Sequence, residues 1–115
     1  MEAKISEQIL RECKSHSIKN NTIESCGLIL KYNPEVFFPM QNNLQSNSRF
    51  ELDSKVILIK NKIKAIFHSH PFDIAYPSVA DCNKSRSLGI PYLIYSCIHD
   101  NFIYFNLKKC IPMKV

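Results

Sequence analysis

The segment "FHSHPFDIAYPSVAD", residues 67–81, contains side chains that could hold a metal ion. The run "IKAIFHS" predicts a strand that ends at His68 and His70. Side chains two apart on a strand project from the same face, so both imidazoles could bind one ion. Ser78 and Asp81 are three apart at the expected start of a helix and should share a face. Two histidines and a carboxylate form a ligand set that catalytic zinc sites use, with a fourth position open for water.

Such a site needs a proton acceptor that is not itself a ligand. Zinc lowers the pKa of bound water to roughly 7, but a base must still take the proton. Glu24 is the candidate, because it stands at the entrance of the otherwise apolar strand "IESCGLIL". A carboxylate is costly to bury there without a partner, and an activated water would be such a partner.

Each of these features alone also has a structural interpretation. A histidine pair on a strand often only forms hydrogen bonds, and Ser78-x-x-Asp81 after a proline is close to a helix capping box. Glu24 alone would most often be a carboxylate at a strand edge. Cys26 lies two residues from Glu24, but no histidine is assigned to it, so a structural role is expected. The prediction of a metal site therefore depends on the joint spacing.

Taken together, these residues resemble the JAMM motif of MPN-domain metalloproteases. The motif reads Glu24, then His68-Ser69-His70-Pro71, with seven residues between the second histidine and Ser78, and then two residues before Asp81. The flanking stretches "ESCGLIL" and "GIPYLIYS" are also similar to the family. The resemblance implies that His68, His70 and Asp81 bind Zn²⁺, with water as the fourth ligand. Glu24 would be the general base and then the acid, and Ser78 would donate a hydrogen bond to the oxyanion.

The resemblance also implies a fold and a range of substrates. The expected fold is α/β (α+β): one MPN-type domain over residues 1–115, with helices packed on a mixed, curved sheet in a cytidine-deaminase-like architecture. The expected enzyme hydrolyses a peptide or isopeptide bond of a protein or peptide substrate. The compact chain looks most like the prokaryotic and phage branch, which includes the N-terminal domain of phage tail-assembly proteins. Other compact members of the family trim or release ubiquitin-like sulfur-carrier proteins. The alternative to an enzyme is a non-catalytic assembly or interaction module whose metal is structural.

The composition is that of one ordinary globular domain, with 115 residues, 45% hydrophobic and 22% charged. The longest apolar run, "IPYLIYSCI", is about half of a membrane span, and the charged N-terminus predicts no signal peptide. We therefore expect a cytoplasmic location, in a bacterium or a phage-infected host. Five cysteines without a CxxC pair predict neither disulfides nor a cysteine-type zinc site. The net charge of +5 comes from dispersed lysines, and "KNKIK" lacks interleaved aromatics, so nucleic-acid binding is not expected.

The apolar periodicity predicts the elements that position these residues. Helices are expected at 3–13 and 78–89, and a third at 53–63, where "VILI" is also compatible with a strand. The loop at 70–77 should fold the start of the last helix back over the histidines. The expected strands are 24–32, 35–40 (bent or at an edge because of Pro39), 49–52, 63–69, 90–97 and 102–107.

Overall fold

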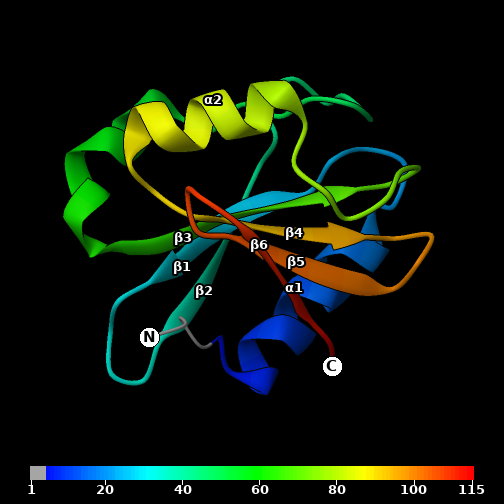
Figure 1. Cartoon of the computed structure of the whole chain (residues 1–115), viewed down its shortest axis with the longest axis horizontal. Helices are drawn as coiled ribbons and strands as arrows, with labels where there is room; N and C mark the ends of the chain where they lie inside the picture. Colours follow the sequence, from blue (N-terminus) through cyan, green and yellow to red (C-terminus); the bar gives the residue numbers. More distant parts are fainter. Residues whose placement is uncertain (1–4) are drawn as a thin grey trace.

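The computed structural model describes residues 5–115, which form a mixed six-stranded sheet with helices packed on both faces (Figure 1). This confirms the α/β class expected from the order of the elements. In chain order they are α1 (Glu7–Lys19), β1 (Cys26–Leu30), β2 (Val36–Met40), the 3₁₀ helix η1 (Ser54–Lys62), β3 (Ile63–His70), α2 (Val79–Leu88), β4 (Tyr92–Ser96), β5 (Asn101–Phe105) and β6 (Cys110–Met113).

The strand order in the sheet is β2-β1-β3-β4-β5-β6. Strands β3 and β4 are parallel, and every other neighbouring pair is antiparallel. The parallel connection runs through α2, as a crossover requires. Both edge strands contain a proline, Pro39 in β2 and Pro112 in β6. A proline has no N–H for the ladder and is tolerated at an edge, so the expected edge position of the 35–40 strand is confirmed.

The two faces of the sheet bury separate apolar clusters. On one face α1 packs through Ile9, Leu10 and Cys13. On the other face, α2 and η1 cover a second cluster that includes Ile66 and Tyr92. Strand β3 supplies both clusters, because successive side chains point to opposite faces. His68 and His70 share the parity of Ile66, so they lie on the face covered by α2.

Several element boundaries differ from the sequence prediction. The first helix begins at Glu7, after the Ser6 cap, and ends at Lys19; residues 3 and 4 of the predicted range lie outside the described residues. The predicted strand at 49–52 is wrong, because these residues form a loop. The 53–63 segment is helical, but as 3₁₀ rather than α. Strand β6 was missing from the prediction, because "KKCIPMKV" is short and contains a proline.

The cysteines behave as the sequence predicts. All five are free thiols; Cys13 and Cys26 are buried and the other three are half-buried. Burial raises the pKa of the Cys26 thiol to about 12, so this neighbour of Glu24 is a poor nucleophile at neutral pH. Among residues 5–115, no helix is long and apolar enough to cross a membrane.

Candidate metal centre

Strand β3 ends at the two histidines, deep in the molecule. The side chain of His68 is fully buried, and that of His70 is 11% exposed. Tyr92 on β4 meets the His68 ring edge-on, with ring centroids 5.2 Å apart. The two imidazoles lie with their centroids 5.1 Å apart, on the same side of the strand. The expected i, i+2 arrangement is therefore confirmed.

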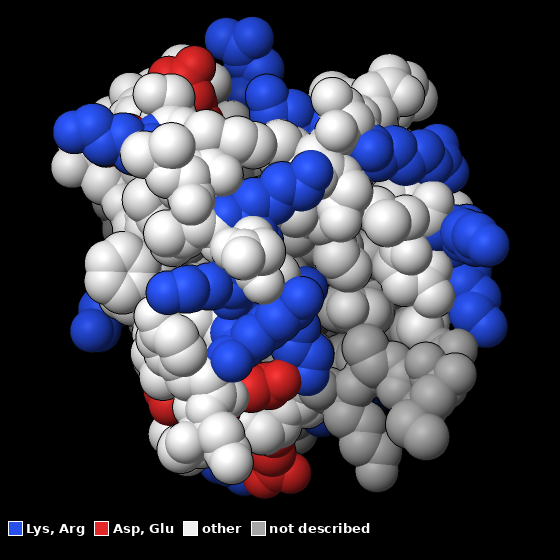
Figure 2. Space-filling view, turned by 90° about the vertical axis from the view of Figure 1, so that its left-hand side faces the viewer, with Lys and Arg blue, Asp and Glu red and all other residues white. Residues whose placement is uncertain are grey.

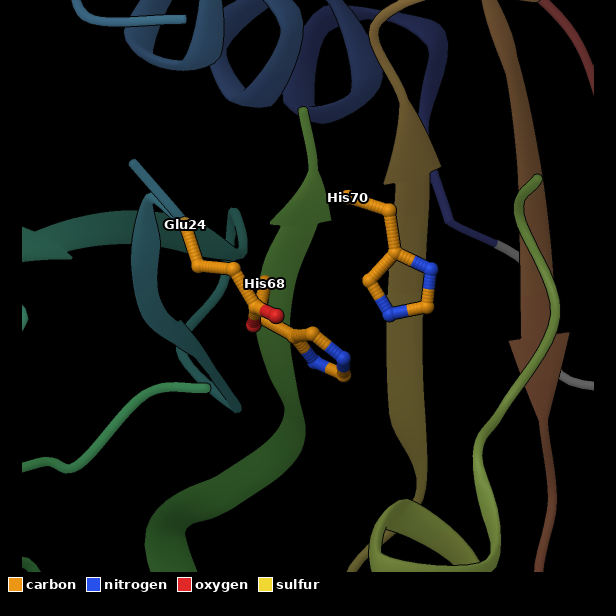
Figure 3. Close-up of side chains that lie close together, drawn as sticks. All are labelled: Glu24, His68 and His70. Atoms are coloured by element: carbon orange, nitrogen blue, oxygen red, sulfur yellow. The ribbon is translucent and has the colours of Figure 1, made fainter. Parts of the chain in front are cut away.

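Glu24 reaches the same place from the neighbouring strand. Cys26 of β1 lies opposite His68, so Glu24, two residues earlier, is level with His70. The pairing continues past the end of β1, where the Ser69 amide donates to the Ser25 carbonyl at 2.9 Å. Glu24 is 4% exposed, and its carboxylate points toward the two imidazoles (Figure 3). Ligand atoms of Glu24, His68 and His70 all lie within 4.8 Å of one another, so these residues could hold a metal ion.

The start of α2 brings Asp81 against both histidines. Its Oδ2 atom lies 3.3 Å from His68 Nε2 and 3.5 Å from His70 Nε2. Asp81 also forms a capping box with Ser78: the Ser78 amide donates to Asp81 Oδ2, and the Asp81 amide donates to Ser78 Oγ. Asp81 thus takes part both in the helix cap and in the contacts with the histidines. Since Ser78 Oγ accepts a hydrogen bond in the cap, its own proton remains available to donate.

The charges in this group influence one another. Burial raises the pKa of Glu24, an effect that the nearby histidines partly oppose. Burial would also raise the pKa of Asp81, but hydrogen bonds from His68 and His70 outweigh it and hold that pKa well below its usual range. Burial would lower the pKa of His70, yet the bonds to Asp81 and to the Ile74 carbonyl raise it. A positive charge beside the Asp81 carboxylate is therefore favoured.

The ring nitrogens indicate how that positive charge could be supplied. His70 Nδ1 lies 2.7 Å from the Ile74 carbonyl, which can only accept, so Nδ1 must carry a proton. In the neutral ring, the lone pair of Nε2 then faces the Asp81 carboxylate, so either a second proton on Nε2 or a metal ion must lie between them. Histidine ligands of metals commonly donate their other N–H to a carbonyl in this way. His68 Nδ1 is buried and has no hydrogen-bond partner among the described residues.

Sequence reasoning missed Asn42, which organises the loop beside Glu24. Asn42 is 3% exposed, and its side-chain amide makes all four hydrogen bonds that it can. Nδ2 donates to the carbonyls of Glu24 (3.0 Å) and Arg49 (2.9 Å). Oδ1 accepts from the amides of Leu44 (3.0 Å) and Glu51 (3.1 Å). The loop at 42–51 is thereby closed on itself and tied to the backbone of Glu24.

The same loop places an aromatic side chain on the site. Phe50 stacks on the His68 ring, with centroids 4.4 Å apart and planes 20° apart. The Glu24 amide donates to the Ser46 carbonyl at 2.7 Å, which attaches the loop at a second point. The only signal in the sequence was the cluster of asparagines and serines in "QNNLQSNS", which is typical of any polar loop.

Replacing Asn42 by alanine is expected to destabilise the protein by about 2–3 kcal/mol, because four backbone groups lose a partner and some of them are buried. The free energy of unfolding in urea, measured on zinc-free protein, checks this. Asn43→Ala is the matched control: this neighbour is exposed and should change stability by less than about 0.5 kcal/mol. Equal effects of the two substitutions would contradict the assigned role of Asn42.

A cleft of about 500 Å³ opens beside the candidate centre. Glu24, Ser78 and Asp81 line one part of it, and the loop at 44–54, η1 and the end of α2 line the rest. The polar loop "QNNLQSNS" contributes Leu44 and Ser48 to the lining, whereas no residue of "PFDIAYP" lines this cleft.

The other side of η1 carries much of the positive charge. Lysines that are dispersed in the sequence gather on this face (Figure 2). Lys31, Lys60 and Lys64 line a shallow hollow there, next to Ile57 and Leu58. Lys64 is paired with Glu35, so part of this charge is neutralised within the molecule.

Comparisons with known proteins support the fold. No family model matches the chain, and no curated protein matches it. Among solved structures, the solution structure of protein DSY2949 from Desulfitobacterium hafniense is similar, with a TM-score of 0.69. The two sequences are 21% identical, and the match covers 95% of this chain and 88% of the other. At this identity the likeness establishes the shared fold and no more.

Proposed function

We propose that the protein is a zinc-dependent peptidase or isopeptidase, in which His68, His70 and Asp81 hold the metal and Glu24 is the general base. One observation carries this proposal: Nε2 of both histidines lies within 3.5 Å of the same carboxylate oxygen, Asp81 Oδ2. The resemblance of the motif to the JAMM metalloproteases supports the same assignment.

The two distances from Asp81 Oδ2 to the histidine nitrogens are compatible with zinc. Zinc–nitrogen and zinc–oxygen bonds are about 2.0–2.2 Å, so two ligands on adjacent corners of a tetrahedron lie roughly 3.3–3.6 Å apart. The observed distances from Asp81 Oδ2 are 3.3 and 3.5 Å. The donor set of two imidazoles and one carboxylate also suits zinc and leaves one position open, as catalytic sites require. When bound, zinc supplies one thing: it lowers the pKa of water enough for attack at neutral pH.

The remaining chemistry belongs to the side chains. Glu24 accepts the proton of the attacking water and returns it to the leaving amine. Its burial and the attachment of its backbone to the 42–51 loop hold the carboxylate toward the histidines. Ser78 donates a hydrogen bond from its hydroxyl to the carbonyl oxygen of the scissile amide as negative charge develops there. The Ile74 carbonyl and Phe50 hold the two imidazole rings in orientation.

Zinc titration of the purified protein tests this proposal. We expect one zinc ion per chain, and at free zinc 100-fold above Kd a gain of about 2.7 kcal/mol in unfolding free energy. Zinc-loaded protein should cut members of a peptide pool made from a proteome digest, as detected by mass spectrometry. A chelator should abolish the cutting, and added zinc should restore it. A protein that binds no zinc, or that cuts equally well in chelator, would exclude the proposed function.

A further inference from the structure

The cleft beside the candidate centre has a chemically mixed lining. Glu24, Ser78 and Asp81 contribute the groups of the candidate centre. Bulky aliphatic side chains from three separate segments also line it: Leu44, Leu52, Val56, Ile57, Leu88 and Ile90. The lining includes two basic and two further acidic side chains as well: Arg49, Lys84, Glu51 and Asp53. The cleft volume of about 500 Å³ is typical of small-molecule and side-chain binding sites.

The aliphatic part of the lining is only half packed. Leu52, Val56 and Leu88 pack against the second core cluster on one side but stay partly exposed on the other. Ile57 is 52% exposed although it lines the cleft. Apolar side chains left facing a concavity next to reactive groups are typical of a binding site, since scattered exposed apolar residues do not form a pocket.

The composition of the lining indicates the occupant. A polypeptide whose scissile amide lies beside Ser78 and Asp81 occupies the same cleft as the aliphatic side chains, so a neighbouring substrate side chain can contact them. An apolar side chain would take this aliphatic surface out of water, whereas a small one would leave it hydrated. The charged residues of the lining are of both signs, and a charged substrate side chain would lose hydration against the aliphatic surface.

We propose that the cleft binds a bulky apolar side chain, such as leucine or phenylalanine, next to the scissile amide of a polypeptide substrate. This assignment rests on the proposed function, because it identifies the substrate of that same centre. Ile57 is then a specificity-determining residue, and its neighbour Leu58 is not. Leu58 is 77% exposed and lines the lysine-bordered hollow instead of the cleft.

Peptide binding, measured by NMR, tests the inference without relying on hydrolysis. The probes are blocked tripeptides Ac-Gly-Xaa-Gly-NH₂ with Xaa as Leu, Phe, Ala or Asp, added to the full chain with zinc and separately with a chelator. Leu and Phe peptides should bind at least about tenfold more tightly than Ala or Asp peptides. The methyl signals of Val56, Ile57 and Leu88 should shift on binding.

Adjacent variants provide the matched control. Ile57→Asp should weaken binding of the Leu and Phe peptides at least about fivefold, Ile57→Ser should weaken it less, and Leu58→Asp should leave it unchanged. Both residues are exposed, so the folding of these variants should be unaffected. Equal binding of all four peptides, or equal effects of Ile57→Asp and Leu58→Asp, would overturn the inference. Selective binding without any hydrolysis would support the pocket while refuting the proposed peptidase activity.

Discussion

Glu24→Gln is expected to keep zinc bound and to lower kcat by about 10²- to 10⁴-fold, the range for loss of a general base. Glutamine has nearly the same shape and can remain in the buried site, but its amide cannot accept the proton of the attacking water. Zinc content and the rate of peptide cleavage, measured on the same preparation, check that zinc is retained and that kcat falls. His68→Ala is the contrasting variant and should lose both zinc and activity.

The same substitution distinguishes two roles for Glu24. The carboxylate lies within 4.8 Å of the histidine nitrogens, so it could itself be a metal ligand. A ligand role requires Glu24→Gln to lose much of its zinc affinity, whereas a base role requires the affinity to change little. The base role is favoured because Asp81 Oδ2 already lies 3.3 and 3.5 Å from the two imidazoles. Full activity in a zinc-loaded Glu24→Gln protein would exclude Glu24 as the general base.

Local sequence patterns predicted the parts of the site that depend on secondary structure. His68 and His70 share a face because strand side chains alternate, and Ser78 and Asp81 share a helix start because of the capping box. These relations span only a few residues. The approach of Asp81 to the histidines across the 70–77 loop, by contrast, was expected from the joint spacing, and the distances now support it.

The loop at 42–51 could not be predicted in the same way. Its conformation is fixed by Asn42, whose four partners are spread between Glu24 and Glu51. Hydrogen bonds to backbone groups leave no residue-type signature in the partners, so the sequence shows only an asparagine among many polar residues. The alternation of apolar and charged side chains in "RFEL", residues 49–52, predicts a strand. In the loop that forms instead, Phe50 stacks on His68 and Leu52 lines the cleft.

Asp81 caps α2 and is the proposed third metal ligand, and a second variant should separate the two roles. Asp81→Asn is expected to lower zinc affinity at least about 100-fold, because it replaces a charged ligand by a neutral one. The asparagine oxygen can still accept from the Ser78 amide, so the start of α2 should persist. Ser78→Ala should do the opposite: it removes the cap to the Asp81 amide, costs about 1 kcal/mol, and leaves zinc affinity within a few-fold.

The effect of Asp81→Asn on the free energy of unfolding depends on pH and is best measured on zinc-free protein. In the zinc-free state the raised pKa of His70 stabilises the fold below its unfolded pKa, and this contribution is lost as pH rises through the folded value. The lowered pKa of Asp81 stabilises the fold above its unfolded pKa and is lost in acid. Asp81→Asn should therefore be most destabilising in mildly acidic solution, where both groups are charged, and less so in alkaline solution. If Asp81→Asn kept its zinc affinity, Asp81 would be a helix cap and not a ligand.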